Sequence, residues 1–262
     1  MKRYRILYNP LAGDGTGREA AMHLLDLLPD CELRFYDLTT IGSISSFLTK
    51  NDPKDALLLA GGDGTLSRFA NEAVTLSPRQ EVYYYATGVH NDFWHDIGRQ
   101  RGDPPVRVNR YLENLPVMRT GDGDLRFLNG VTASAGVPFS AAHSHSTTVT
   151  VTVDGVSHVF HRAWLVAVTH GKHLGGFLLS PSQDGLSAGR TLTVTVLHGV
   201  GRFGVAHVFR ALRTGRPIRH SAAVTVLTGK QITVCGSTGQ LPLTVTRDST
   251  HSPSSGEIRC GR

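Results

Sequence analysis

A buried strand that ends in a glycine-rich turn constrains this chain most, and it lies within Ala56–Asn71, ALLLAGGDGTLSRFAN. The apolar run Ala56–Ala60 is unbroken, which is typical of a strand covered on both faces in a parallel sheet. Apolar residues then recur at helical spacing, so the turn joins this strand to a helix. The pattern predicts an α/β domain. An ordinary strand-to-helix turn without a ligand is the alternative that this stretch alone leaves open.

The turn combines glycines with one carboxylate and one hydroxyl. Glycine lets the backbone turn tightly and come close to a ligand, and the glycines here are Gly61, Gly62 and Gly64. We expect Thr65 to cap the following helix, whose free N–H groups form an anion site. Asp63 would place a carboxylate beside that site, where a metal–phosphate needs one. The turn is therefore a candidate phosphate site.

The first part of the chain alternates predicted strands with predicted helices. We predict strands at 4–8, 32–36, 56–60 and 82–86, and helices at 18–28, at 43–49 and directly after the glycine turn. This alternation is typical of a doubly wound parallel sheet, in which ligands bind outside the carboxyl ends of the strands. Polar, glycine-containing loops follow the first, third and fourth of these strands. We therefore expect the loops to meet at one edge of the sheet.

The character of the sequence changes near Asp103-Pro104-Pro105. Downstream, β-branched and polar residues alternate, as in Thr147–Val153, TTVTVTV, and Thr191–Leu197, TLTVTVL. Segments 223–227 and 241–245 follow the same pattern, which is typical of half-buried antiparallel strands. One helix is predicted near 205–212. We predict two domains: an α/β domain over 1–105 and an all-β, sandwich-like domain over 106–262.

Charge and cysteine content narrow the choice of partner and compartment. Lys and Arg number 27 against 21 Asp and Glu, and the net charge of +6 favours a nucleotide, a phospholipid surface or nucleic acid. Cys31, Cys235 and Cys260 form no CxxC pair, so neither a disulfide framework nor a zinc site is indicated. The first residues lack the apolar core of a signal peptide, and no run has the length of a membrane span. We expect a cytoplasmic protein.

Three motifs in the first domain resemble the diacylglycerol kinase catalytic domain family, which includes sphingosine kinases and soluble bacterial lipid kinases. They are the pentapeptide Gly61–Thr65, the Asn-Pro-x-x-Gly loop Asn9–Gly13, and the loop Gly88–Phe93 with its Asn-Asp-Phe. The resemblance covers most of the chain, because Phe127–Asn129 is similar to the opening of the second domain of that family. A Walker-type GxxxxGK[ST] motif is absent, so the sequence does not support P-loop chemistry.

The resemblance implies an ATP-dependent lipid kinase that transfers a phosphoryl group to a hydroxyl of diacylglycerol or a related lipid. Its first domain would hold ATP and Mg²⁺, and its second would help to bind the lipid. Phosphoryl transfer depends mainly on positioning and on charge neutralisation. Asp63 would orient Mg²⁺ or the water shell of the phosphate. The residues implied in nucleotide binding are Asn9, Pro10, Gly13, Thr39, Thr40, Gly61, Gly62, Gly64, Thr65, Gly88 and Asn91.

Several positions depart from the family pattern. The third loop of the family reads Gly-Thr-x-Asn-Asp-Phe, and Val89 replaces its threonine. An Asp-Gly-x-Leu-Asp segment of the family binds a structural Mg²⁺, whereas residues 187–192 read SAGRTL and Asp184 is the candidate metal ligand. The family's catalytic base lies in an Asp-Gly-Glu near the C-terminus. Here the corresponding residues are Thr246-Arg247-Asp248, which makes Asp248 the candidate base.

Three functions are left open. The first is an active lipid kinase with Asp248 or Asp184 as its base, and the second is a non-catalytic member that binds nucleotide or lipid in a regulatory role. The third is an NAD kinase-like enzyme, because NAD kinases share the GGDGT motif. NAD kinases pair that motif with an Asn-Glu dipeptide on a later loop, whereas Asn71-Glu72 here follows the motif on the same helix.

The expected partners are a lipid substrate and, peripherally, a membrane surface, without nucleic acid; a homodimer is left open. The candidate membrane contact is the predicted helix near 205–212 and its basic flanks. In that arrangement Val205, Val208, Phe209 and Leu212 would face lipid, with Arg210 and Arg213 near the head groups. The alternative is an ordinary helix whose apolar face packs on the sandwich.

Overall fold

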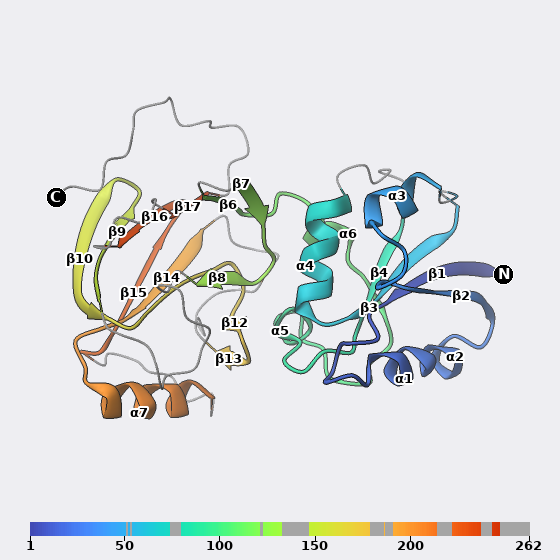
Figure 1. Cartoon of the computed structure of the whole chain (residues 1–262), viewed down its shortest axis with the longest axis horizontal. Helices are drawn as coiled ribbons and strands as arrows, with labels where there is room; N and C mark the ends of the chain where they lie inside the picture. The colour runs from blue at the N-terminus through green and yellow to red at the C-terminus, as the bar shows by residue number, and fades with distance from the viewer. Residues whose placement is uncertain are drawn as a thin grey trace. The chain divides into compact units, whose positions relative to one another are not determined.

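The chain forms two compact units, Met1–Glu113 and Asn114–Arg262 (Figure 1). The computed structural model describes residues 1–50, 52, 54–73, 80–120, 123–132, 147–178, 186, 191–213, 222–236 and 243–246.

The first unit is built on a five-stranded sheet with the order β2-β1-β3-β4-β5. Its strands are β1 (Lys2–Tyr8), β2 (Cys31–Asp37), β3 (Ala56–Gly61), β4 (Val82–Ala86) and β5 (Val106–Arg107). The pairs β1–β2, β1–β3 and β3–β4 are parallel, and the edge strand β5 is antiparallel to β4. Every residue of β3 is buried, as its unbroken apolar run predicted. The predicted doubly wound sheet is confirmed.

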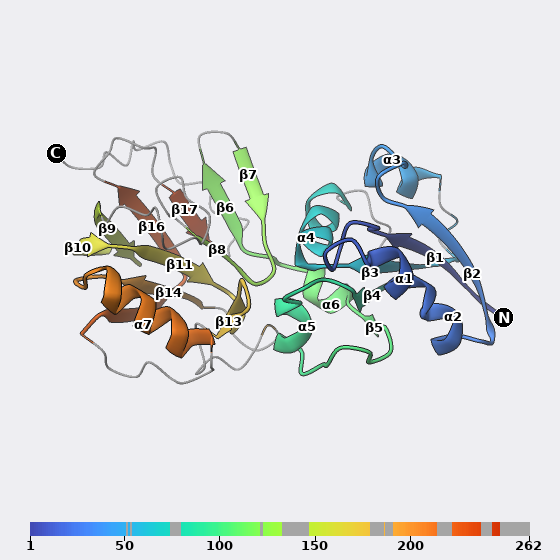
Figure 2. The same cartoon turned by 60° about the horizontal axis from the view of Figure 1, so that its bottom comes forward.

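Helices cover both faces of this sheet (Figures 1 and 2). They are α1 (Gly17–Met22), α2 (Leu24–Leu27), α3 (Ile44–Thr49), α4 (Asp63–Glu72), α5 (Asp92–Asp96) and α6 (Asn109–Leu112). Ala21 and Leu24 of α1 and α2 pack in one buried cluster with Leu58 of β3. The helix predicted over 18–28 is thus two short helices, which meet at His23.

The first unit extends slightly beyond the predicted domain boundary at 105/106. β5 pairs with β4, and the Val108 N–H donates to the carbonyl of Val82 at 2.8 Å. The ring of Tyr111 in α6 lies edge-on to Phe93, with centroids 5.3 Å apart. These contacts attach residues 106–113 to the first unit, although the prediction assigned them to the second domain.

The second unit contains two larger antiparallel sheets, with the strand orders β10-β9-β16-β17-β6-β7 and β15-β14-β11-β8, and a β12–β13 hairpin. Its elements are β6 (Val117–Thr120), β7 (Gly123–Arg126), β8 (Gly130–Thr132), β9 (Thr147–Val153), β10 (Val156–Ala163), β11 (Leu165–Thr169), β12 (His173–Leu174), β13 (Phe177–Leu178), β14 (Leu192–Leu197), α7 (Arg202–Arg213), β15 (Val224–Gly229), β16 (Gln231–Gly236) and β17 (Leu243–Thr246).

The core of the second unit lies between these two sheets. Val151 and Ile232 of the larger sheet share one buried cluster with Val168 and Val194 of the smaller sheet. Residues of β9 alternate between buried and half-buried, as the sequence predicted. This confirms the predicted β-sandwich-like domain.

The smaller sheet is buried on its outer face as well, because α7 packs against it. Val205 and Val208 of α7 share a buried cluster with Leu165, Ala167 and Leu197. All residues of β14 are therefore buried, and the prediction of a half-buried strand there was wrong. Packing contradicts the lipid-facing arrangement for two residues of the helix, because Val205 and Val208 face the protein interior, with exposed fractions of 2% and 6%. The side chains of Phe209, Leu212 and Arg213 lie outside the described residues.

The structure also bears on the expectations about cysteines and about membrane-spanning segments. Cys31 is a free thiol, but Cys235 is disulfide-bonded, which the scattered cysteines did not predict. Across the residues that the structure describes, no helix is long and apolar enough to cross a membrane.

Candidate functional site

Three loops contact one another at the carboxyl ends of β1, β3 and β4, and we call residues 9–17, 61–65 and 87–92 the loop cluster. The Asn9 side chain donates from Nδ2 to Thr65 Oγ1 at 3.0 Å, which joins the first two loops. A Cβ atom added to Gly88 would lie only 2.6 Å from the Cα of Gly62, so the second and third loops pack backbone against backbone. The cluster confirms that the three loops meet, as the strand order requires.

Glycine is required where loops cross closely. Gly13 has a φ of +60°, and a Cβ there would lie 2.5 Å from the carbonyl oxygen of Thr87. At Gly61, a Cβ would meet the Thr65 side chain at the same distance. The predicted residues Gly13, Gly61, Gly62 and Gly88 are thus brought together, and Pro10 lies in the turn that follows Asn9.

The predicted cap of α4 is wrong, because the helix begins at Asp63 and its N-cap residue is Gly62. Thr65 lies within the first turn, is 6% exposed, and uses its hydroxyl as the acceptor for Asn9. Glycine has no side chain that could cap a helix. Within the described chain, the backbone N–H groups of Gly62, Asp63 and Gly64 consequently have no acceptor. A helix N-terminus in this state attracts anions.

Asp63 connects the second loop to the third. Its Oδ2 accepts from the N–H of Asp92 at 2.9 Å, and its Oδ1 accepts from the N–H of Phe93 at 3.0 Å. The carboxylate thus caps the N-terminus of α5, a role that the sequence analysis did not foresee. Each oxygen keeps a further lone pair. Among the described residues, no group of three or more His, Cys, Asp or Glu side chains could hold a metal ion.

Asn91 closes the third loop on itself. Its φ is +53°, in the left-handed region, where asparagine is tolerated better than most residues. Its Oδ1 accepts from the Gly88 N–H at 2.9 Å, and its Nδ2 donates to the Gly88 carbonyl at 2.8 Å. The side chain is 4% exposed, so Asn91 shapes the loop. Val89, which replaces the threonine of the family, is 59% exposed.

A buried tyrosine of β4 holds the second loop of the cluster through a hydrogen bond. Tyr84 of β4 is fully buried and donates from its hydroxyl to the Gly61 carbonyl at 2.9 Å. Burial raises the pKa of the Tyr84 hydroxyl well above its ordinary value, and the nearby Asp63 and Asp92 carboxylates raise it further. The phenol therefore stays protonated and remains a donor.

The predicted threonines at the end of β2 are held by an aspartate that the sequence analysis missed. Asp37 Oδ1 accepts from the Thr39 hydroxyl at 2.6 Å and from the Thr39 N–H at 2.8 Å. The Thr40 hydroxyl donates to the Asp37 carbonyl at 2.9 Å. The hydrogen bonds from Thr39 lower the pKa of the Asp37 carboxyl. Both threonines are exposed. The preceding residue, Leu38, donates its N–H to the carbonyl of Tyr8, the last residue before the first loop, so the threonines follow a segment that is paired with β1.

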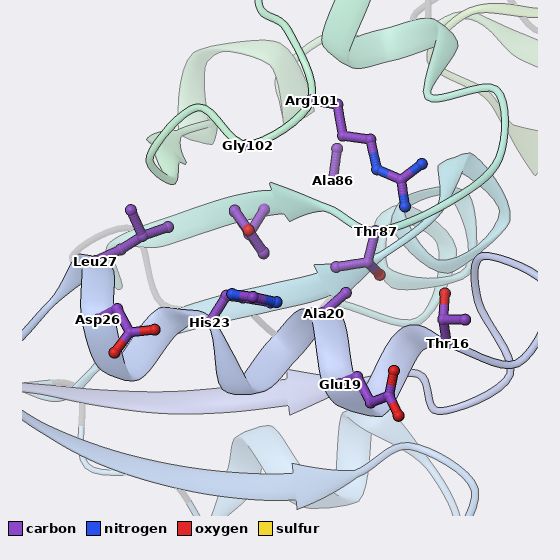
Figure 3. Close-up of a pocket in the computed structure, with 11 residues that line it drawn as sticks. Thr16, Glu19, Ala20, His23, Asp26, Leu27, Ala86, Thr87, Arg101 and Gly102 are labelled. Atoms are coloured by element: carbon purple, nitrogen blue, oxygen red, sulfur yellow. The ribbon is translucent and has the colours of Figure 1, made fainter.

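A cavity of about 470 Å³ lies beside the cluster, between α1, α2 and the end of β4 (Figure 3). Thr16 and Thr87 belong to its wall, together with Glu19, His23 and Arg101. Thr87 is 3% exposed, and its hydroxyl has no hydrogen-bond partner in the described part of the chain. Sequence reasoning passed over Thr87, because a threonine at the end of an apolar strand gives no distinctive signal.

The two remaining candidates, Asp184 and Asp248, lie outside the described residues. Their roles as metal ligand and base stay predictions.

Comparisons with known proteins match both units. The model of the diacylglycerol kinase catalytic domain matches residues 3–117, and that of the YegS C-terminal NAD kinase beta sandwich-like domain matches residues 112–256. A diacylglycerol kinase of Bacillus subtilis (strain 168) is 30% identical over 110 residues, which are 39% of this chain and 35% of the relative. The match thus spans about a third of that relative's length.

Solved structures share the fold at low identity. A putative diacylglycerol kinase from Bacillus anthracis str. Sterne is 18% identical, with a TM-score of 0.64 and 94% of each chain covered. A second structure of a diacylglycerol kinase from that organism is 19% identical, with a TM-score of 0.63, over 94% of this chain and 93% of that one. At these identities the likeness shows a shared fold and nothing further.

Proposed function

Because this chain belongs to the diacylglycerol kinase catalytic domain family and also carries a YegS-type C-terminal domain, we propose that it is an ATP-dependent kinase that phosphorylates a hydroxyl of a lipid. One observation carries the proposal. At the carboxyl edge of the sheet, the N–H groups of Gly62, Asp63 and Gly64 have no acceptor within the described chain.

These N–H groups fit the phosphates of a nucleotide. The dipole of the ten-residue helix α4 adds positive potential at the same place. Gly62 and Gly64 have no side chain to keep an anion away from the backbone. Asn9 and Thr65 hold the first loop against the helix, so the cluster is formed before a ligand arrives. Preorganised donors of this kind cost little reorganisation when charge develops during the reaction.

The residues present also fit a magnesium ion that arrives with the nucleotide. Mg²⁺ in kinase sites is typically held by one or two carboxylates together with substrate phosphates and water. Asp63 would be such a carboxylate through its remaining lone pairs, while its hydrogen bonds keep α5 in place. Bound Mg·ATP would supply the phosphoryl group and neutralise part of its charge. The described residues do not form a complete metal site by themselves.

The base that accepts the proton of the lipid hydroxyl is proposed to be Asp248, on the resemblance alone. A carboxylate within hydrogen-bond reach of the hydroxyl would take its proton as the oxygen attacks. Asp184 is the alternative base and the proposed metal ligand. The second unit, which matches the YegS C-terminal NAD kinase beta sandwich-like domain, would bind the lipid, as the resemblance implies.

Phosphoryl transfer from labelled ATP to diacylglycerol, a sphingoid base, undecaprenol or NAD tests the proposal. We expect transfer to one of the lipids, loss of transfer in Asp248→Ala, and unchanged nucleotide affinity in that variant. In Asp63→Ala, phosphoryl transfer should be lost and nucleotide affinity should depend less on Mg²⁺. Thermal unfolding of each variant shows whether a loss of activity comes from a loss of folded protein.

The remaining outcomes identify the competing functions. Nucleotide binding without transfer to any acceptor would instead support a regulatory family member. Transfer to NAD and to no lipid would support an NAD kinase-like enzyme. Full activity of Asp248→Ala would remove that residue as the base.

A further inference from the structure

The cavity beside the loop cluster is not used by the proposed nucleotide site. It has a volume of about 470 Å³ and lies between the helices α1 and α2 and the segment that follows α5, with the end of β4 at its base (Figure 3). Cavities of roughly 300–1,000 Å³ are typical of small-molecule sites. Thr16 and Thr87 of the loop cluster border this cavity, but Gly62, Asp63 and Gly64 do not. The cavity is therefore a separate candidate site.

The base of the cavity is apolar except for one hydroxyl. Tyr85, Ala86 and Thr87 line it and are all buried. The Thr87 hydroxyl has no hydrogen-bond partner within the described chain. A buried hydroxyl without a partner is unfavourable, and a ligand that bonds to it would remove this cost. The base thus offers a ligand an apolar surface and one polar contact.

The walls of the cavity carry opposite charges that do not pair with each other. Glu19, His23 and Asp26 lie at i, i+4 and i+7 along α1 and α2, a spacing that places them on one side of the helices. Arg101 belongs to the facing wall, and its side chain extends toward α1 (Figure 3). No ion pair joins Arg101 to Glu19 or Asp26, although the structure describes all three side chains.

The charge of Arg101 also reaches the base of the cavity. Burial raises the pKa of the Tyr85 hydroxyl, and the Arg101 guanidinium acts on that pKa in the opposite direction. A guanidinium offers paired N–H donors that match the two oxygens of a carboxylate. A ligand that is only an anion would bring its charge near the carboxylates of Glu19 and Asp26 as well. The arrangement therefore favours a ligand that carries both charges.

We propose that this cavity binds a small zwitterion with an apolar body, of the class of α-amino acids with aromatic or aliphatic side chains. Arg101 holds the carboxylate, and Glu19 or Asp26 on the opposite wall holds the ammonium group. The apolar body packs on Tyr85 and Ala86 at the base. A ligand with a single charge leaves the wall of like sign unmatched, which lowers its affinity.

The bound zwitterion would contact the junction of two loops of the cluster. Its polar groups give the Thr87 hydroxyl a partner, and the Thr87 N–H already donates to the carbonyl of Gly61 at 2.9 Å. A ligand that binds only the folded state raises the unfolding temperature, so we expect the zwitterion to stabilise the protein. The proposal goes beyond the proposed function and does not depend on it, because binding in this cavity requires no nucleotide.

Titration of the full chain with three matched probes, followed in ¹⁵N–¹H spectra, tests the site. The probes are L-phenylalanine, 3-phenylpropionate, which lacks the ammonium group, and 2-phenylethylamine, which lacks the carboxylate. We expect phenylalanine to shift the amide signals of Ala20 and Thr87, which line the cavity. Phenylalanine should bind about fivefold or more tightly than either probe with a single charge.

Variants of the cavity identify the contacts. Arg101→Met should weaken the binding of phenylalanine about tenfold. The matched control Arg99→Met, which changes an arginine two residues away that does not line the cavity, should leave binding unchanged. Thr87→Val should weaken binding about threefold or more through loss of the hydroxyl. Phenylalanine should raise the unfolding temperature of the unmodified chain and of Arg99→Met more than that of Arg101→Met.

Several outcomes would overturn the proposal. One is equal affinity of the chain for the three probes, and another is equal affinity of Arg101→Met and Arg99→Met for phenylalanine. Absence of phenylalanine binding near its solubility limit, or shifts confined to signals outside the cavity, would also overturn it. If no probe binds and Arg101→Met alone lowers the unfolding temperature, the two walls pair with each other in solution instead of with a ligand.

Discussion

The polar groups at the two ends of the parallel sheet in the first unit differ in how they are bonded. At the amino end, Asp55 is 4% exposed and forms ion pairs with Arg3 at 2.8 Å and with Arg5 at 3.0 Å, although its Oδ1 accepts no hydrogen bond within the described residues. At the carboxyl end, the N–H groups that begin α4 have no acceptor within the described chain, and the buried Thr87 hydroxyl has none either. The amino end thus pairs its charges within the fold, whereas the carboxyl end has donor groups without acceptors, where we propose that a ligand binds.

A second network at the amino end strengthens this contrast. Glu81 pairs with Lys2 at 2.7 Å and with Arg107 at 3.2 Å, which ties β1 and β5 to the start of β4. Lys2 also lies over the ring of Tyr83, 4.5 Å from its centroid. These charges are partly exposed, and each of them has an opposite charge within the first unit as its partner. Substitutions at the two ends should therefore have different consequences for stability and for nucleotide affinity.

The largest expected effect is that of Gly88→Ala at the carboxyl end. The new Cβ would lie 2.6 Å from Gly62 Cα, and the backbone cannot yield without opening the loop cluster. We expect nucleotide binding to be lost and the free energy of unfolding to fall by about 3 kcal/mol. Denaturant unfolding and calorimetric titration with ATP measure both. Gly201→Ala, where nothing lies within 4 Å of the new Cβ, is the matched control and should change neither.

Asp55→Ala should separate stability from binding. It leaves the largely buried Arg5 without its partner, and removal of one member of a buried ion pair is strongly destabilising. Arg3 is partly exposed and regains hydration, so we expect a loss of about 2 kcal/mol of unfolding free energy. Nucleotide affinity should stay unchanged. A loss of affinity as large as that in Gly88→Ala would contradict the division of roles between the two ends.

Thr87→Val should stabilise the protein, whereas Gly88→Ala and Asp55→Ala should destabilise it. The substitution replaces a buried hydroxyl that lacks a partner in the described chain with a methyl group of similar size. We expect the free energy of unfolding to rise by about 1 kcal/mol in denaturant titrations. A decrease of similar size would show that the hydroxyl is satisfied in solution, and the carboxyl end would then be less open than the comparison holds.

The smallest effect concerns pH. The hydrogen bond from Lys2 lowers the pKa of the Glu81 carboxyl, and Arg107 adds to this effect. A carboxyl whose pKa is lowered by folding stabilises the protein above its unfolded pKa, and this contribution is lost as pH falls through the folded pKa. Glu81→Gln should therefore flatten the fall in stability below pH about 4.5, by less than about 1 kcal/mol because the pair is partly exposed. An equal fall of the unfolding temperature below pH about 4.5 in Glu81→Gln and in the unmodified chain would contradict this.

Much of the fold could be predicted because local patterns agreed with the tertiary structure. The apolar run of β3 and the alternation of β9 reflect burial on two faces and on one face, respectively. The alternation of β14 misled, since a distant segment, α7, covers the face that the pattern marked as exposed. Residues 106–113 were misassigned for a similar reason: the pairing of β5 with β4 is set by the sheet and has no local signal.

The site was predictable in its location but less so in its bonding. The glycines and Asp63 meet where the strand order requires. Sequence could not show that Asp63 caps α5, because this contact depends on how the second and third loops pack against each other. The bonds between Asn91 and Gly88 depend on the left-handed backbone of Asn91 within the third loop, which the sequence did not reveal. Thr87 was missed because its role depends on burial. Asp37 was missed although its contact with Thr39, two residues later, is of a local kind that the sequence could have suggested.

The most direct test of the central claim is a ¹⁵N–¹H spectrum of the chain titrated with ATP in the presence of Mg²⁺. We predict that the amide signals of Gly62, Asp63 and Gly64 shift most, because their N–H groups would become donors to phosphate. Saturable ATP binding that leaves these three signals in place while others shift would contradict the claim that the loop cluster holds the phosphates.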